Sequence, residues 1–128
     1  MVGIVLVSHS AALAEGLAEI VGQVAGDEVR IETAGGTSDG RLGTSGDRVE
    51  AALAGADSGD GVVVLADLGS SVLVVRHVLD YLGVNGRIRL VDAPMVEGAI
   101  AAAVVASSGA GIAEVARAAE SARDAHKF

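Results

Sequence analysis

The sequence predicts a doubly wound α/β fold, in which a mainly parallel four-stranded sheet has helices on both faces. Apolar, β-branched runs of strand length alternate with segments whose apolar residues have helical spacing. The alternation repeats about every 30 residues, which is typical of βαβ units. The 128 residues allow one core, so we expect a single domain over 1–128 with a loose tail at about 123–128.

The first half of the chain predicts two strands and two helices. Residues 2–7 (VGIVLV) are continuously apolar, as expected of a strand buried on both faces. A helix over 11–24, capped by Ser10, has an apolar face made of Leu13, Leu17, Ile20, Val21 and Val24. A second strand at 29–33 (VRIET) leads into a glycine-rich loop at 35–47, and a short helix is expected over about 48–53.

The second half predicts two further strands and three helices. The run at 61–66 (GVVVLA) is a third apolar strand. A helix over 71–82 follows it, with five apolar residues expected to face inward: Val72, Val75, Val78, Leu79 and Leu82. A fourth strand at 87–91 (RIRLV) precedes two alanine-rich helices, over about 96–106 and 112–122.

The composition argues against several classes of function. A net charge of −8, with nine lysines and arginines, disfavours a nucleic-acid partner, because cationic side chains bind phosphate backbones. The chain has no cysteine, which excludes disulfides and thiolate metal sites and fits a reducing cytoplasm. Its apolar runs are too short or too rich in serine and glycine to span a membrane. We expect a cytoplasmic domain without cofactor, metal, membrane or nucleic acid.

The candidate site lies after the predicted strands, because open parallel sheets bind ligands beyond the carboxyl ends of their strands. His9 follows the first strand and precedes a helix, where free backbone N–H groups favour an anion such as a phosphoryl group. Asp67 follows the third strand. If the two strands are neighbours, Asp67 can accept a hydrogen bond from one nitrogen of His9 and leave the other as a nucleophile. The ordinary alternatives are that His9 is a neighbour of a helix cap and Asp67 the cap of the next helix.

Small residues near these two could donate hydrogen bonds to phosphoryl oxygens, although ordinary helix starts look similar. These supporting residues are Ser10, Gly69, Ser70 and Ser71. The glycine-rich loop contains neither GxxxxGK[ST] nor GxGxxG and so is not a nucleotide-binding loop. Arg41 and Thr44 could reach a phosphate or a partner, but a mobile, solvated loop without direct chemistry is the favoured interpretation.

The other titratable candidates have simpler explanations. His77 falls within a helix, away from any strand end, and His126 falls in the tail. Neither has the companions that a metal site needs. Glu97 could act as an acid or base, but a carboxylate in the first turn of a helix is favoured by the helix dipole alone.

Three segments carry a family resemblance: VLVSHS after the first strand, VVLADLGSS after the third, and DAPMVEGAIAAAV around the first alanine-rich helix. Together they resemble the mannose-type EIIA domain of DhaM, the phosphotransferase subunit of PTS-dependent dihydroxyacetone kinases, over essentially the whole chain. The resemblance implies the strand order 2-1-3-4 and a homodimer. It also implies a phosphohistidine carrier in which His9 accepts the phosphoryl group and Asp67 orients His9.

The resemblance further implies a relay of phosphoryl transfers. Phosphoenolpyruvate phosphorylates enzyme I, enzyme I phosphorylates HPr, and HPr phosphorylates His9. The group then passes to ADP bound on the DhaL subunit. The ATP formed there phosphorylates dihydroxyacetone bound by DhaK. Some family members continue into HPr-like and enzyme-I-like domains, whereas this chain ends at Phe128, so the donor is expected to be a separate protein that contacts Leu42 and Leu68.

Two other functions remain open at this point. The first is an EIIA component of a mannose-family sugar transport system, which would use the same His9 chemistry with another acceptor. The DLGSS turn and the APMVEG segment favour the kinase. The second is a non-catalytic regulatory or binding domain, in which His9 takes no phosphoryl group.

Overall fold

The protein has one four-stranded parallel sheet in the order β2-β1-β3-β4. The structure is a computed structural model that describes residues 1–84 and 86–128. The strands are β1 (Gly3–Ser8), β2 (Ile31–Gly35), β3 (Val62–Ala66) and β4 (Ile88–Leu90). The predicted fold class is confirmed, and so is the strand order that the resemblance implied.

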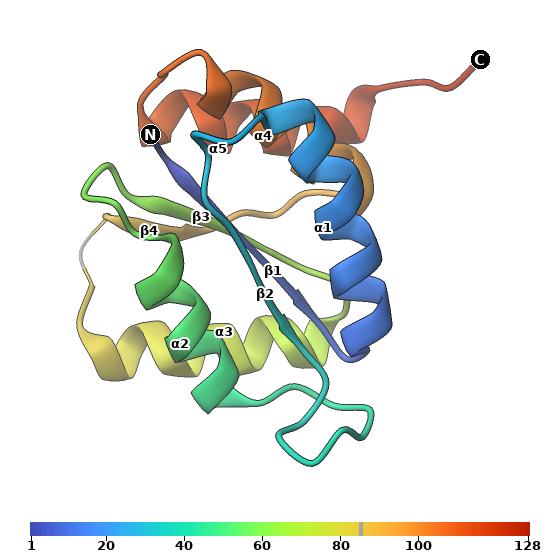
Figure 1. Cartoon of the computed structure of the whole chain (residues 1–128), viewed down its shortest axis with the longest axis vertical. Coiled ribbons are helices and arrows are strands. Elements are labelled where there is room, and N and C mark those ends of the chain that lie inside the picture. The colour runs from blue at the N-terminus through green and yellow to red at the C-terminus, as the bar shows by residue number, and fades with distance from the viewer. Residues whose placement is uncertain (85) are drawn as a thin grey trace.

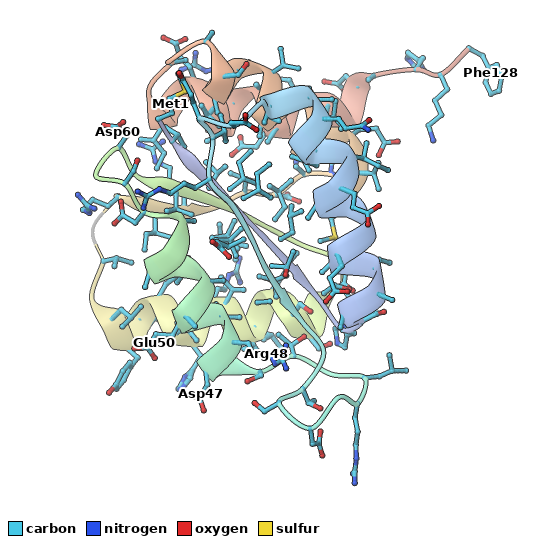
Figure 2. The ribbon with its side chains drawn as sticks, viewed as in Figure 1. Met1, Asp47, Arg48, Glu50, Asp60 and Phe128 are labelled. Carbon is cyan, nitrogen blue, oxygen red and sulfur yellow. The ribbon has the colours of Figure 1, made fainter. Side chains whose placement is uncertain are left out.

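Helices cover both faces of the sheet (Figure 1). On one face lie α1 (Ala11–Ala25), α4 (Met95–Ser107) and α5 (Ile112–Ser121), and on the other lie α2 (Gly46–Ala56) and α3 (Gly69–Leu82). A 3-10 turn (Ala122–Asp124) follows α5, and Phe128 ends a segment that projects from the body (Figure 2). No helix of the described part of the chain combines the length and apolarity needed to cross a membrane.

The core is divided between the two faces by the alternation of side chains along each strand. Ile4 and Leu6 of β1 pack with α1, α4 and α5, whereas Val5 and Val7 pack with α2 and α3. All six residues of β1 are buried. The central strand is therefore rigidly held, and the residues that follow it start from a fixed position.

Several element boundaries differ from the sequence-based expectation. Strand β2 lies two residues later than 29–33, because Ala34 and Gly35 pair with the end of β1. Helix α2 is longer than expected and is capped by Ser45, whose hydroxyl accepts from the Arg48 N–H at 3.3 Å. Helix α3 begins at Gly69 rather than at residue 71, so Gly69 and Ser70 belong to its first turn.

The apolar stripe of α1 is only partly buried. Leu17 and Val21 lie in the core together with Ala14 and Ala25, whereas three residues of the predicted stripe are 41–53% exposed: Leu13, Ile20 and Val24. The stripe is wider than the surface that the sheet and the alanine-rich face of α4 cover. Leu82, the last residue of α3, was expected to face inward and is also exposed.

A close contact at Gly35 brings the end of β2 against the start of α1. A β-carbon at Gly35 would lie 2.7 Å from the Ala11 Cα atom and 2.8 Å from the Ser10 carbonyl oxygen. A larger residue would force the two segments apart. The glycine-rich loop therefore leaves the sheet directly beside His9.

Candidate functional site

The backbone on both sides of His9 is fixed by hydrogen bonds. The His9 N–H donates to Asp67 Oδ2 at 3.0 Å, and the His9 carbonyl accepts from the Gly43 N–H at 2.9 Å. The Ser10 hydroxyl caps α1 by accepting from the Leu13 N–H at 3.2 Å, as expected for a helix N-cap. His9 therefore occupies a defined turn between β1 and α1.

The His9 ring contacts Asp67, as the sequence predicts for neighbouring strands. Strands β1 and β3 pair with Val7 opposite Ala66, so the residues that follow them meet at one edge of the sheet. His9 Nδ1 lies 3.2 Å from Asp67 Oδ1. The two side chains are 26% and 15% exposed, so the pair is only partly shielded from water.

The Asp67 carboxylate also accepts hydrogen bonds from its other neighbours. Oδ2 accepts from the Ser8 hydroxyl at 2.8 Å, and Oδ1 accepts from the Ser71 hydroxyl at 2.9 Å and the Leu68 N–H at 2.8 Å. Burial raises the pKa of Asp67, but hydrogen bonds from the His9 backbone, Ser8, Ser71 and the His9 ring outweigh it and lower the pKa to about 2. Near neutral pH the carboxylate is therefore ionised and can only accept hydrogen bonds.

An ionised Asp67 determines the tautomer of the His9 ring. Because the carboxylate has no proton to donate, the hydrogen of the neutral ring resides on Nδ1, and Nε2 has a free lone pair. The hydroxyl of Ser70 lies 2.5 Å from Nε2, so it donates to this nitrogen. The arrangement presents Nε2 as a nucleophile at the protein surface, covered by one exposed serine side chain.

Ser71 and Thr44 extend the network toward the glycine-rich loop. Ser71 is fully buried, and its Oγ lies 3.0 Å from His9 Nδ1 and 2.7 Å from Thr44 Oγ1. Residues 38–42 of the loop are exposed, as expected of a solvated loop. Its end at Gly43 and Thr44 instead contacts His9 and Ser71, a connection that the sequence interpretation disfavoured.

The start of α3 faces the same site. The first N–H groups of a helix have no intrahelical acceptor, and Leu68, at the N-cap position, makes no capping hydrogen bond with its side chain. Asp67 is therefore not the cap of this helix, although it does accept from the Leu68 N–H. The N–H groups of the first turn, which includes Gly69 and Ser70, remain available to an anion.

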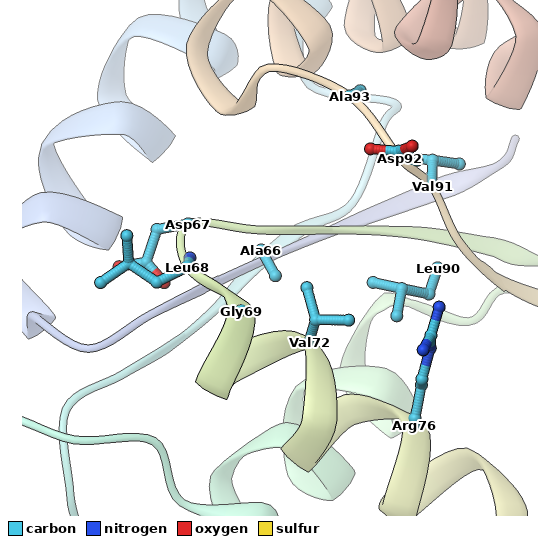
Figure 3. A pocket seen from close by; sticks show the side chains of 10 residues that line it. All are labelled: Ala66, Asp67, Leu68, Gly69, Val72, Arg76, Leu90, Val91, Asp92 and Ala93. Carbon is cyan, nitrogen blue, oxygen red and sulfur yellow. The ribbon is translucent and has the colours of Figure 1, made fainter.

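Two hollows flank Asp67. One, of about 480 Å³, lies between the start of α3 and the segment after β4, with Leu68 and Gly69 on one side and Leu90 and Asp92 on the other (Figure 3). The second, of about 340 Å³, is an apolar groove between α1 and α4 that Leu13, Ile20 and Val96 line. The His9 site therefore sits at a concave and partly apolar edge of the sheet.

Of the predicted supporting residues, the structure brings Ser70 and Ser71 into contact with His9, whereas Ser10 serves as a helix cap and Gly69 begins α3. Ser8, which donates to Asp67, was not among the residues predicted for the site. Its position between strand and histidine was visible, but strand pairing was needed to show which way it points.

The other histidines lie outside this network. His77 lines a separate hollow of about 270 Å³ with Asp47, Glu50 and Tyr81, and His126 is exposed in the tail. Within residues 1–84 and 86–128, no group of three or more His, Cys, Asp or Glu side chains could hold a metal ion. Glu97 pairs with Lys127 at 3.3 Å; its own backbone N–H and Lys127 lower its pKa.

The chain is similar to proteins of one family. Residues 3–116 match the EIIA-man family, described as the PTS system fructose IIA component. The phosphoryl donor subunit DhaM of PEP-dependent dihydroxyacetone kinase 2 from Listeria innocua is 40% identical over 106 residues, covering 81% of this chain and 85% of the relative. Its Escherichia coli K12 counterpart is 38% identical over 120 residues, covering 90% of this chain but 25% of the relative. A crystal structure of a protein of unknown function, EF1359, matches with a TM-score of 0.83 and 35% identity, covering 100% of this chain and 98% of that one.

Proposed function

The chain belongs to the mannose-type EIIA family of the phosphotransferase system, and from this premise we propose that it is a phosphoryl donor subunit of a PEP-dependent dihydroxyacetone kinase. The Listeria relative supports this function, because this chain aligns with most of its length. The chain spans a quarter of the Escherichia coli relative, so the functions of that protein's remaining three quarters are not transferred.

In this proposal His9 Nε2 is the atom that accepts the phosphoryl group. The observation that carries it is the ring held by Asp67 at Nδ1, 3.2 Å away, with Nε2 directed to the surface. The Nε2 lone pair forms a bond to phosphorus while the bond between phosphorus and the donor's nitrogen breaks, and the donor nitrogen keeps that electron pair. Nδ1 retains its proton throughout.

Asp67 stabilises the charge that this transfer creates. As the N–P bond forms, the ring becomes cationic, and an adjacent carboxylate favours that state. The carboxylate is already ionised and fixed by Ser8, Ser71 and the Leu68 N–H. It therefore needs little reorganisation when the charge appears.

The start of α3 receives the phosphoryl oxygens. Ser70 must leave Nε2 for phosphorus to approach, and its hydroxyl can then donate to an oxygen of the incoming group. Free N–H groups of the first turn and the helix dipole favour the same negative charge. Positioning and charge stabilisation account for most of what a protein does in phosphoryl transfer.

The proposed partners are those that the family resemblance implies. HPr is the phosphoryl donor, and ADP held by DhaL, with DhaK beside it, is the acceptor. Leu68 and Leu42, which are 59% and 79% exposed, offer apolar contacts beside His9. We further propose a homodimer and a cytoplasmic location, since phosphoenolpyruvate and ADP, the two ends of the relay, are cytoplasmic metabolites.

The test is phosphorylation of the purified protein by phosphoenolpyruvate, enzyme I and HPr, followed by intact mass. One acid-labile phosphoryl group is expected on the wild type and none on His9→Ala. His77→Ala serves as the matched control, because His77 lies outside the network, and it should be phosphorylated like the wild type. The phosphorylated protein should then transfer its phosphoryl group to ADP bound on DhaL.

The possible outcomes separate the three functions. Phosphorylation of His9 with transfer to a sugar-transporter EIIB, and none to DhaL, would indicate the transport function instead. No phosphorylation by enzyme I and HPr that are active on another acceptor would indicate a non-catalytic domain.

A further inference from the structure

We propose that Thr44, on the glycine-rich loop, is a positioning residue for His9, and that its hydroxyl acts through Ser71 to hold the ring in the tautomer that leaves Nε2 free. The effect of this tautomer on phosphoryl transfer rests on the proposed function. The tautomer itself is a property of the unmodified protein and can be measured without any partner.

The directions of the hydrogen bonds follow from the charge on Asp67. A carboxylate only accepts, so the single hydrogen of the Ser71 hydroxyl points to Asp67 Oδ1, 2.9 Å away. The hydrogen on His9 Nδ1 points to Oδ1 at 3.2 Å and to Ser71 Oγ at 3.0 Å. Since the hydrogen of Ser71 is already used, Thr44 is the donor in the 2.7 Å contact between the two hydroxyls.

Thr44 thus completes the hydrogen bonding of the Ser71 hydroxyl. The Ser71 hydroxyl donates its hydrogen once, to Asp67, and its oxygen accepts twice, from Thr44 and from His9. With all three positions filled, the Ser71 side chain has one favourable orientation. Without the Thr44 hydroxyl, Ser71 can turn its hydrogen toward Nδ1, an arrangement that belongs to the tautomer with its proton on Nε2.

The backbone places Thr44 for this contact. The preceding residue, Gly43, donates its N–H to the His9 carbonyl at 2.9 Å, and the following residue, Ser45, caps α2. Thr44 is half-buried, and the Ser71 side chain that it covers is fully buried. Gly43 and Thr44 therefore connect the loop to His9 twice, once through the backbone and once through Ser71.

The experiment compares three variants of the full chain. Thr44→Val keeps the side-chain shape and removes the hydroxyl, Thr44→Ser keeps the hydroxyl, and Thr37→Val is a control within the same loop. Thr37 hydrogen-bonds to Asp39 and Arg41, and its loss alters the loop without removing the donor to Ser71. The readouts are the nitrogen NMR shifts of the His9 ring and the single-turnover rate of phosphorylation by phosphorylated HPr.

We expect Thr44→Val to populate the Nε2-protonated tautomer measurably and to slow phosphorylation about fivefold, the size of effect that one neutral hydrogen bond provides. Thr44→Ser should restore most of the rate and the wild-type ring shifts. Thr37→Val should leave the ring shifts as in the wild type. The same slowing by Thr44→Val and Thr37→Val, with unchanged ring shifts, would overturn the proposal, because the loop would then act on the partner rather than on His9.

Two further measurements keep the test decisive. Thr44→Ala also lacks the hydroxyl but has no γ-methyl group to crowd Ser71, so it replaces Thr44→Val if that variant misfolds. In a Ser71→Ala background, Thr44→Ala should have no additional effect on the ring shifts, whereas additive effects would contradict action through Ser71. If the wild type takes no phosphoryl group, the proposed function fails, and the ring shifts still decide the role of Thr44.

Discussion

The turns after β3 and β4 each contain an aspartate, and the two aspartates differ in burial and in hydrogen bonding. Asp67 follows β3 directly, its side chain is 15% exposed, and it accepts five hydrogen bonds from Ser8, His9, Leu68 and Ser71. Asp92 follows the end of β4 by one residue, its side chain is 97% exposed, and it pairs with Arg123 at 3.4 Å. The two aspartates line the same hollow (Figure 3).

The difference is explained by the place of each strand in the sheet. Strand β3 lies between β1 and β4, so Asp67 has the end of β1, with Ser8 and His9, beside it. Strand β4 is at the edge of the sheet, so Asp92 has a neighbouring strand on one side alone. An aspartate after a parallel strand thus becomes part of a site when the neighbouring strand ends in residues that donate to it, as β1 does with Ser8 and His9.

The largest expected effect is on phosphoryl transfer. Asp67→Ala should slow phosphorylation of His9 about 100-fold or more, because the ring loses the partner that fixes its tautomer. Asp92→Ala should change the phosphorylation rate by no more than about twofold, because the Asp92 side chain pairs with Arg123 and not with the His9 ring. Single-turnover rates with phosphorylated HPr, on variants whose folding is confirmed by circular dichroism, measure both. Similar rates for the two variants would mean that contact with His9 does not distinguish Asp67 from Asp92 in phosphoryl transfer.

The next effect concerns stability at low pH. The pKa of Asp67 in the folded protein is about 2, below its ordinary value of 3.8, so the stabilisation is complete above pH 3.8 and is lost as the pH falls toward 2. The contribution is about 2 kcal/mol of unfolding free energy. Urea unfolding from pH 5 to pH 2 should show a weaker pH dependence for Asp67→Asn than for the wild type.

Asp92→Asn is the matched control for that measurement. Other carboxylates with a lowered pKa, such as Asp57, also contribute to acid unfolding, so the difference between the two variants is the relevant quantity. Equal slopes for Asp67→Asn and Asp92→Asn would mean that the Asp67 hydrogen bonds do not stabilise the fold.

The smallest effect concerns the side chains next to the two aspartates. Leu68 is 59% exposed beside Asp67, whereas Ala93, beside Asp92, is half-buried. Leu68→Asp should slow transfer from HPr about tenfold, and Leu42→Ala about threefold, if both contact the donor. Val104→Asp, at an exposed valine near the end of α4, is the control. Unchanged transfer rates in both leucine variants would place the docking surface elsewhere.

The sequence was sufficient for the fold class and for the two central residues of the candidate site. Buried parallel strands are apolar throughout, so VGIVLV and GVVVLA were recognisable as strands, with His9 two residues after the first and Asp67 directly after the second. Strand β2 was misplaced because hydrophobicity favoured Val29, whereas pairing with β1 extends to Gly35. Hydrophobicity alone does not report which residues a neighbouring strand will pair with.

The contacts that surround the pair could not be predicted from spacing. Ser8 and Thr44 are ordinary residues in the sequence, and their hydrogen bonds to Asp67 and Ser71 arise between segments far apart in the chain. Likewise, Leu13 and Ile20 share helical spacing with the buried Leu17, yet they are exposed, because the neighbouring elements cover a narrower face of α1 than the stripe suggests.

The strand order has a consequence for synthesis of the protein. The central strand β1 emerges from the ribosome before both of its neighbours, and it gains its second neighbour when β3, beginning at Val62, has been made. His9 is therefore synthesised well before its partners Asp67 and Ser71. The pairing of β1 with β3 joins distant segments of the chain, and such contacts form slowly. A nascent chain that ends before β3 contains the histidine without its site, so such a chain would expose the unpaired apolar edge of β1 to chaperones.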